Sequence, residues 1–339
     1  MLAAAREFTC AADEVWRLQR GSELDCVFFQ RAVNGGERIT DKGSRQGFWL
    51  FAPSGVLLAR CNTRNVESVL ATFAAGRLAY DALEPEQRAL AGDAELEPVH
   101  RWEHYYPEDG LVLRRTARDL APEGLAAAAG PGWNRDYAWF SRAELSSALP
   151  ADALPADAPL GTELPLPLVA RRLARFHLVD NARGQTIPYA EAEVEQAELV
   201  ARVVSRRADA ALELVLEGAS RAVSEGQWLL GENLWKPRRD LAHDIRCRLL
   251  GRALWDPEAQ RFLEFELVAL ARREGRTQFN GRAGSLGPSL LAFHFELAAE
   301  AARIAPTFVA LYEAPWIEQP ALAPWFDSPA ECGLEVDGR

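Results

Sequence analysis

The sequence predicts an α+β protein, in which an α/β amino-terminal part precedes an antiparallel β-barrel or sandwich. Three observations carry this prediction. Residues 47–83 follow the order strand, tight turn, strand and amphipathic helix, and a proline-rich stretch interrupts the middle of the chain. From about residue 211 onward, apolar and polar residues alternate with a period of two, which is typical of strands with one buried face. A length of 339 residues also suits two domains of ordinary size.

The α/β pattern of the first part rests on two short aromatic and aliphatic runs. Residues 47–51 (GFWLF) and 56–60 (VLLAR) predict strands, and the A-P-S-G sequence between them predicts a turn. Asn65 is a candidate amino-terminal cap for the helix that follows and ends before Pro85. The apolar residues of that helix fall on one stripe with a 3.6-residue period: Val66, Val69, Leu70, Phe73, Ala74 and Leu78.

A tandem A-L-P-A-D repeat over residues 148–157 predicts the boundary between the two parts. Each proline fixes φ and removes a backbone donor, so neither a helix nor a strand ladder is expected there. The preceding helix begins at a capping box formed by Ser141 and Glu144. The predicted organisation is an α/β domain with a carboxy-terminal extension, a proline-rich linker, an antiparallel β domain and a tail, over residues 1–148, 149–167, 168–318 and 319–339.

The clearest strands of the second part form a hairpin over residues 245–271. A five-residue turn at 256–260 would place Arg252 opposite Glu264 and Leu250 opposite Glu266. One face of this hairpin is then apolar and the other carries arginines and glutamates, as in a sheet with one solvated face. Further strands with the same alternation are expected at residues 211–217 and 291–297.

Residues 47–83 resemble the second half of a thioredoxin-like domain, and residues 8–15 resemble the strand that follows the redox helix in that family. The chain also resembles uncharacterised bacterial proteins that join such a domain to a β-rich region. This second resemblance rests on residues 106–113, 133–139 and 265–269. The resemblance implies an incomplete thioredoxin-like fold. The chain has no CxxC pair, and Arg45-Gln46 stands where the family has its cis-proline, so the residues present argue against disulfide exchange.

Charge and cysteine usage exclude several classes of protein. The chain has 38 basic and 49 acidic residues and a net charge of −11, which argues against a nucleic-acid partner bound through a basic surface. No apolar run is long enough to cross a membrane, and the start of the chain lacks a signal peptide's apolar core. The five cysteines are scattered, which predicts a cytoplasmic protein without a disulfide framework.

Two sets of residues could carry chemistry, and both have a plainer interpretation. Cys26 or Cys61 could serve a thiol oxidoreductase, but Glu23 and Asp25 flank Cys26 and favour an inert thiol. The H-x-x-E-H sequence of His100, Glu103 and His104 matches a zinc-hydrolase pattern. Prolines on both sides leave little room for the long helix such a motif needs, so surface or packed polar residues are the alternative.

Polar groups in the second part suggest a ligand site at loops or strand ends, where β-barrels commonly bind small molecules. The candidate ligand-binding residues are Asp180, Asn181, Arg183, Trp235, Lys236, Gln278 and Asn280. Ordinary turns with exposed Asn and Arg side chains are the alternative.

The leading hypothesis is therefore a non-catalytic protein without a cofactor, whose β domain binds a small molecule or a protein partner and whose thioredoxin-like part is a docking or structural element. A thiol oxidoreductase is the second hypothesis, and a metal-dependent hydrolase is the third.

Overall fold

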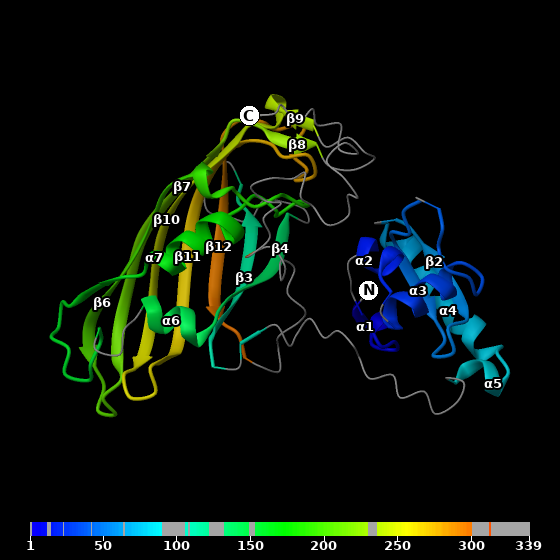
Figure 1. Ribbon diagram of the computed structural model, residues 1–339, viewed down its shortest axis with the longest axis horizontal. Helices are drawn as coiled ribbons and strands as arrows, with labels where there is room; N and C mark the ends of the chain where they lie inside the picture. The colour runs from blue at the N-terminus through cyan, green and yellow to red at the C-terminus, as the bar shows by residue number, and fades with distance from the viewer. Residues whose placement is uncertain are drawn as a thin grey trace. The chain divides into compact units, whose positions relative to one another are not determined.

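The computed structural model of the protein describes residues 2–11, 15–22, 24–41, 43–63, 65–89, 106–107, 109–121, 132–148, 153–229, 236–299 and 312. The chain divides into two compact units, Met1–Arg101 and Trp102–Arg339. Figure 1 shows the described helices and strands of both units.

The first unit is a small α/β unit built around one β-hairpin. Strands β1 (Phe48–Phe51) and β2 (Leu57–Cys61) pair in antiparallel fashion, as the two strand-like runs predict. Helix α4 (Val66–Asp81) follows, and the Asn65 side chain accepts the Ser68 amide at its start, which confirms the predicted cap. The other helices of the unit are α1 (Leu2–Ala5), α2 (Val15–Arg20), α3 (Leu24–Val33) and α5 (Pro85–Arg88).

Two expectations for this unit differ from the structure. Residues 8–11 form no strand, and Val15 begins helix α2, so the strand suggested by the thioredoxin resemblance is not found there. The apolar stripe of α4 is largely exposed within the described residues: Val69 is buried, whereas Leu78 is 71% exposed. The helix approaches the hairpin through Gly76 instead, where a Cβ atom would lie only 2.6 Å from Leu50 Cδ2.

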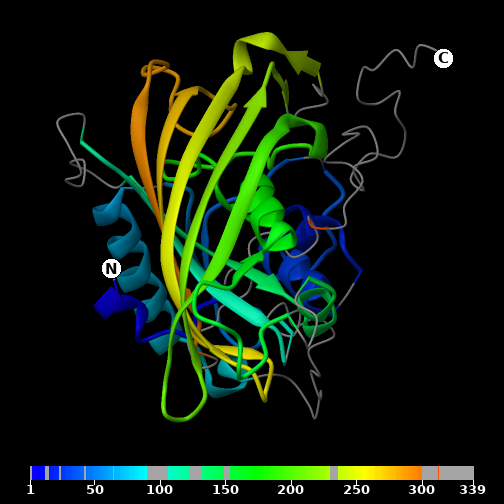
Figure 2. The same cartoon turned by 90° about the vertical axis from the view of Figure 1, so that its left-hand side faces the viewer.

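The second unit contains one eight-stranded antiparallel sheet in the order β4-β3-β12-β11-β10-β7-β6-β5. Figure 2 shows how strongly its long strands twist. The strands are β3 (Leu111–Asp119), β4 (Trp133–Phe140), β5 (Glu163–Pro165), β6 (Val194–Arg206), β7 (Leu212–Ser224), β10 (His243–Asp256), β11 (Arg261–Gly275) and β12 (Ser289–Leu297). A separate two-stranded sheet joins β8 (Gln227–Leu229) to β9 (Lys236–Arg238).

The antiparallel β-sheet of the prediction is present, but in the described part of the chain it does not close into a barrel and has no second layer of strands. Among the described strands, β4 and β5 end the sheet and do not pair with each other. A helical layer covers one face of the sheet and takes the place of the second sheet of a sandwich.

The boundary between the units lies earlier than the proline-rich sequence suggested. Strands β3 and β4 precede residue 149 but pair within the large sheet, because β3 is bonded to β12. Helix α6 (Arg142–Ala148) begins at the predicted capping box, in which the Glu144 amide donates to Ser141 Oγ and the Ser141 amide donates to Glu144 Oε2. Strand β5 lies in the described part of the linker and pairs with β6. Leu154, Ala158 and Leu166 of the same linker are buried in the core.

The register of the β10–β11 hairpin differs by two residues from the expected one. Arg252 lies opposite Glu266, not Glu264, and Leu250 lies opposite Val268, not Glu266. A tighter turn over residues 257–260 and an irregularity after Leu254 account for the shift. Since side chains alternate with a period of two, a two-residue shift leaves Arg252, Glu264 and Glu266 on the predicted solvated face, whereas at the irregularity itself Phe262 joins the core.

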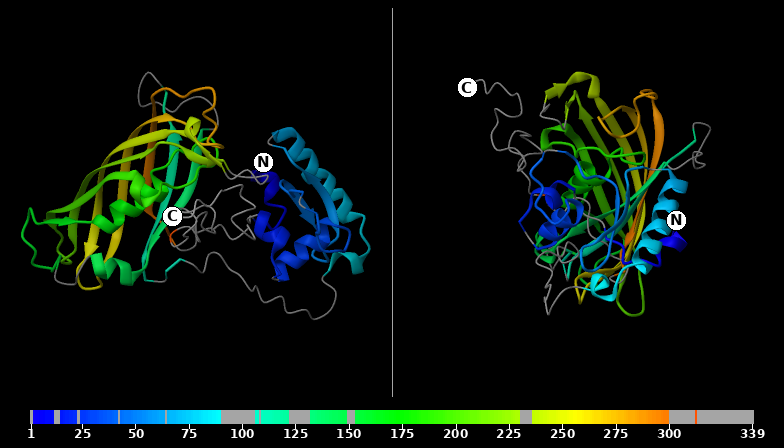
Figure 3. Two further views of the ribbon diagram at one scale, coloured as in Figure 1. Left: turned by 45° about the horizontal axis from the view of Figure 1, so that its top comes forward. Right: turned by 90° about the vertical axis from the view of Figure 1, so that its right-hand side faces the viewer.

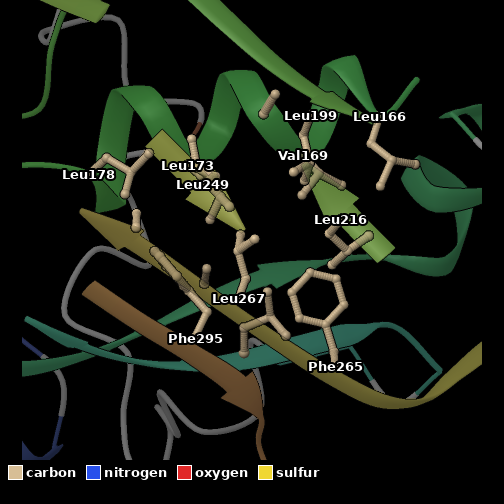
Figure 4. Packing of buried hydrophobic residues seen from close by; sticks show 14 of the residues in the cluster. Leu166, Val169, Leu173, Leu178, Leu199, Leu216, Leu249, Phe265, Leu267 and Phe295 are labelled. Carbon is tan, nitrogen blue, oxygen red and sulfur yellow. The ribbon is translucent and has the colours of Figure 1, made fainter. Parts of the chain in front are cut away.

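The core lies between the sheet and a helical segment formed by α7 (Pro167–Arg172) and the π-helical turn η2 (Leu173–His177). We call the side of the sheet under this segment the helix-covered face; Figure 3 shows α7 lying against it. In Figure 4, Val169 and Leu173 of the segment point toward side chains of the strands, among them Leu199, Leu249, Leu267 and Phe295. Two short 3₁₀ turns, η3 (Glu191–Glu193) and η4 (Arg239–Leu241), complete the unit.

None of the described helices combines the length and the apolar composition that crossing a membrane requires.

Candidate functional site

Charged side chains interrupt the apolar helix-covered face on two neighbouring strands. Along β3 the side chains on this face are Leu111, Leu113, Arg115, Ala117 and Asp119, so two core positions carry charge. On β4, Asp136 occupies the same face as Ala138 and Phe140. Burying a charge is unfavourable unless it is paired, so these positions need an explanation.

Arg115 is completely buried yet poorly partnered. Its Nη2 donates to the Val179 carbonyl oxygen at 3.1 Å, and its guanidinium lies 4.9 Å from the centre of the Phe293 ring. Its Nε and Nη1 have no hydrogen-bond partner among the described residues. Burial lowers the pKa of Arg115 to about 10, against the opposing charges of Asp136 and Asp180, so the side chain stays charged at neutral pH.

Asp136 and His177 form a second buried pair next to Arg115. Nδ1 of His177 lies 3.5 Å from Asp136 Oδ2, and both side chains are at most 1% exposed. Burial alone would raise the pKa of Asp136, but His177 and the charge of Arg115 outweigh it and hold that pKa below its usual value. Burial lowers the pKa of His177, against the attraction of Asp136, so the imidazole is neutral at pH 7.

Tyr312 contacts the other nitrogen of the same imidazole. Its hydroxyl forms a hydrogen bond with His177 Nε2, and its ring lies 4.1 Å from Trp139 and 4.9 Å from Phe176, centre to centre. Arg172 lies over the same ring at 4.3 Å. We call the residues Arg115, Asp136 and His177 the Arg115 site, and Tyr312 holds its histidine in place.

A separate ionic cluster lies where β3 and β11 reach the end of the helix-covered face. The Arg273 guanidinium bonds to both the Asp119 and the Asp180 carboxylates, and its Nε donates to Ser289 Oγ at 3.1 Å. Burial raises the pKa of Asp180, and the charges of Arg273 and nearby Arg282 oppose that rise. We call this cluster the Asp180 network; its members are Asp119, Asp180, Arg273, Arg282 and Asn280.

The Asp180 network joins two loops to the sheet and is nearly saturated with protein partners. Arg282 donates to the Gly275 and Gly287 carbonyl oxygens and to Ser289 Oγ at 2.6–3.0 Å. The Gln185 amide donates to the Phe279 carbonyl oxygen at 3.0 Å, and the loops approach so closely that a Cβ atom at Gly184 would overlap that oxygen. The network therefore fixes the two loops together.

Several residues of the predicted ligand site do come together here. Asn280 donates to Asp180 at 3.2 Å, Arg183 pairs with Asp119, and Asn134 Nδ2 donates to the Asn181 carbonyl oxygen at 2.9 Å. The Asn280 and Arg183 side chains thus bind carboxylates of the protein, whereas Asn181 takes part through its backbone oxygen. Gln278 lies half-buried in the same loop, Trp235 lies outside the described residues, and Lys236 is described only through its backbone in β9.

The candidate thiols differ in their exposure to solvent. Cys26 is 0% exposed within helix α3, whereas Cys61, at the end of β2, borders a hollow of about 550 Å³. That hollow is lined by Val33, Asn34, Ser44, Arg45, Gln46, Trp49, Arg60, Cys61 and Asn62. Burial raises the pKa of Cys247 in the large sheet to about 12, so this thiol is not a nucleophile at neutral pH.

The predicted metal ligands His100, Glu103 and His104 lie outside the described residues. Within the described part of the chain, no group of three or more His, Cys, Asp or Glu side chains is arranged to hold a metal ion.

Sequence reasoning found part of the Asp180 network but missed the Arg115 site. A usable signal is present in the sequence: the alternation L-V-L-R-R-T-A-R-D places Arg115 and Asp119 in phase with Leu111 and Leu113. A charge in phase with core residues marks either a buried ion pair or a functional group. His177 carries no such signal, because its burial depends on the π-helical turn.

No protein-family model, curated protein or solved structure matches this chain, so the geometry of these two clusters carries the functional argument.

Proposed function

We propose that the β-rich unit is a non-catalytic binding module that holds a small carboxylate ligand at Arg115. The observation that carries the proposal is a fully buried guanidinium whose Nε and Nη1 lack partners among the described residues. A buried charge is tolerated where it is paired, and buried polar groups normally find hydrogen-bond partners. A carboxylate supplies the opposite charge and accepts a hydrogen bond that the guanidinium otherwise lacks.

The contrast with Arg273 and Arg282 supports this interpretation. Each nitrogen of these two guanidinium groups donates to a carboxylate, a hydroxyl or a carbonyl oxygen of the protein. The same unit therefore satisfies its buried arginines where their role is structural. Arg115, on a strand adjacent to the edge strand β4, is the exception.

A binding role fits the histidine of the site better than an acid–base role. Tyr312 occupies Nε2 of His177, Nδ1 faces Asp136, and burial disfavours the protonated imidazole. A general base needs a nitrogen that can reach the substrate's proton. We therefore assign His177 to holding Asp136 in position.

For the first unit we propose a thioredoxin-like scaffold that acts in docking or in structure and not in disulfide exchange. The order β1, β2 and α4 supports the likeness, and the complete burial of Cys26 supports the absence of thiol chemistry. We propose the cytoplasm as the location of the whole chain, because its scattered cysteines suit a reducing compartment.

Isothermal titration calorimetry of the full chain tests the proposed carboxylate site. The probes are butyrate, 2-hydroxybutyrate and 2-aminobutyrate, and we expect binding of at least one of them at neutral pH. Arg115→Gln is expected to abolish that binding. Arg183→Gln is the matched control, since Arg183 is a 36%-exposed arginine paired with Asp119, and it should retain binding. Circular dichroism and thermal unfolding check that each variant is folded. Absence of binding by all three probes, or full binding by folded Arg115→Gln, would contradict the proposal.

A further inference from the structure

The outer face of the large sheet, the side opposite the helix-covered face, carries a group of exposed apolar side chains. Leu250 of β10 and Val268 of β11 are directly opposed and are 62% and 46% exposed. Leu270, the next residue on the same face of β11, is 40% exposed and lies opposite the half-buried Ala292 of β12. We call these four residues the apolar strip, which crosses the neighbouring yellow and orange strands of Figure 2. Adjacent exposed apolar side chains are typical of surfaces that bind another molecule.

Two unpaired arginines border the apolar strip, one on each side. Arg248 of β10 is opposite Leu270, and Arg118 of β3 is opposite Ala292, so these residues form one row across four strands. Both arginines are exposed, and neither guanidinium has a hydrogen-bond or ion-pair partner among the described residues. Three strand spacings separate the two ends of the row, which places the arginine backbones about 14 Å apart.

Two further arginines meet at one end of the apolar strip. Arg246 and Arg272 are directly opposite on β10 and β11, one step along the outer face from the row just described. Like charges in such a position destabilise strand pairing. Asp244 and Glu274 pair with them from the side away from the strip. An anionic partner lying on the strip would reduce the remaining repulsion.

Carboxylates also lie beside the apolar strip, and they narrow the class of partner. Glu217 pairs with Arg202 at 3.7 Å and Glu266 pairs with Arg252 at 2.8 Å, so these acids leave the two bordering arginines without a counter-charge. Their own charges would be repelled by a broad anionic surface such as a membrane. The strip has no aromatic ring on which a nucleobase could stack. The face therefore suits a narrow acidic partner that has an apolar side.

We propose that the apolar strip binds an amphipathic helix of a protein partner, in which acidic residues border the apolar stripe on both sides. A helix with its side chains is about 10–12 Å wide, so it fits between Arg248 and Arg118 when it lies along the strands. The apolar stripe covers the strip, and glutamates or aspartates on its two borders reach the two arginines. A helix is also the element that packs on the face of a sheet, as α7 does on the other side.

This inference is independent of the carboxylate site, because Arg115 lies on the helix-covered face.

Fluorescence anisotropy of a labelled synthetic helix with the full chain tests the proposal. The probe is about 18 residues long, with leucines at the i, i+3, i+4 and i+7 spacing and glutamates on both borders. We expect a dissociation constant of about 100 µM or below at low salt, in keeping with a small transient interface, and weaker binding as salt is added. The same peptide with lysines in place of the glutamates should bind at least about tenfold more weakly. No binding of the glutamate peptide at low salt, or equal binding of the two peptides, would overturn the proposal.

Reversal of the two bordering charges locates the interface. The double variant Arg118→Glu with Arg248→Glu should lose binding of the glutamate peptide by at least about tenfold and gain binding of the lysine peptide. Arg31→Glu with Arg77→Glu is the matched control, because both arginines are exposed in the first unit and the change in net charge is the same. A folded Arg118/Arg248 variant that binds the two peptides as the wild type does would contradict the assigned surface. The ranking of the peptides on the unmodified chain decides the proposal even where this variant fails to fold.

Two other occupants of the face give distinct results. Sedimentation of the chain with phosphatidylglycerol vesicles, without any binding of the glutamate peptide, would assign the face to a membrane. Self-association of the chain alone, measured by analytical ultracentrifugation and abolished by the double variant, would assign the face to a second copy of the chain. Either result would overturn the proposal.

Discussion

Tyr312 is held to the β-rich unit by three aromatic or cationic neighbours and one hydrogen bond. Trp139, Phe176 and Arg172 surround its ring, and the hydroxyl reaches His177. Burial raises the pKa of this hydroxyl well above its ordinary value, so it is a neutral donor at neutral pH. The ring and the hydroxyl therefore contribute separately to stability.

Substitution of Tyr312 should separate the two contributions. Tyr312→Phe keeps the ring but leaves His177 Nε2 without its donor, and we expect a loss of about 1 kcal/mol in the free energy of unfolding. Tyr312→Ala also loses the ring contacts and should cost about 3 kcal/mol. Urea denaturation of the full chain measures both. Equal losses for the two variants would contradict the packing described for the ring.

The protonation of His177 should give the protein a specific dependence on pH. Its pKa in the folded state lies below the ordinary 6.5, because burial outweighs Asp136 while Arg115 and Arg172 oppose the proton. The unfolded chain therefore binds a proton first as the pH falls, and the free energy of unfolding should decrease from about pH 6.5 downward.

Urea denaturation at a series of pH values checks this dependence. His177→Gln should weaken the slope between about pH 6.5 and 5. His243→Gln is the parallel comparison, since burial lowers the pKa of that imidazole too and its contribution has the same sign. A His177→Gln profile parallel to that of the wild type in this range would show that His177 is not buried in the neutral form.

Among the elements, the hairpin of β10 and β11 shows what the sequence predicts and what it does not. The period-two alternation assigns each side chain to a face, and away from the irregularity after Leu254 that assignment survives the two-residue change in register. The register itself depends on the tight turn and on a local irregularity, which leave no mark in the hydrophobic pattern. The pairing of β3 with β12 is still harder to predict, because most of the unit's sequence lies between these two strands.

The same limit applies to the candidate site. Asp180, Asn181, Arg183 and Asn280 were identifiable as polar residues near strand ends, and they lie together. That they bind one another is decided by Arg273 and Asp119, two strand residues whose proximity requires the order of the sheet. Local sequence therefore predicts candidate groups, whereas the sheet topology determines which of them remain unpartnered.

Ion pairs on the two faces of the sheet should contribute different amounts to the free energy of unfolding. Arg273→Ala would leave two buried carboxylates facing each other, and we expect a loss of about 3–5 kcal/mol in unfolding free energy. Arg252→Ala is the matched control, because Arg252 is 80% exposed and pairs with Glu266 on the outer face. That change should cost under about 1 kcal/mol. Similar losses in chemical denaturation would contradict the burial described for the Asp180 network.

At the scale of the whole molecule, the cysteines provide a test of both units at once. Cys10 is exposed, whereas Cys26 in the first unit and Cys247 in the second are buried. Iodoacetamide at pH 8 should modify Cys10 in the native protein, and Cys26 and Cys247 only after denaturation, as mapped by mass spectrometry. Rapid native labelling of Cys26 would contradict its burial and favour the thiol oxidoreductase hypothesis over the binding module.

The pairing of β3 with β12 has a consequence for how the chain acquires its structure. The Arg114–Glu296 contact across these strands joins residues 182 positions apart, whereas β3 and β4 are neighbours in the sequence. During synthesis the β3–β4 hairpin emerges early. The other edge of β3 stays unpaired until β12, the last strand of the sheet in the sequence, has been made. Such distant pairings close slowly, and unpaired strand edges favour self-association. Arg115 and Asp136 lie on that early hairpin, so their burial is completed only at the final stage of folding.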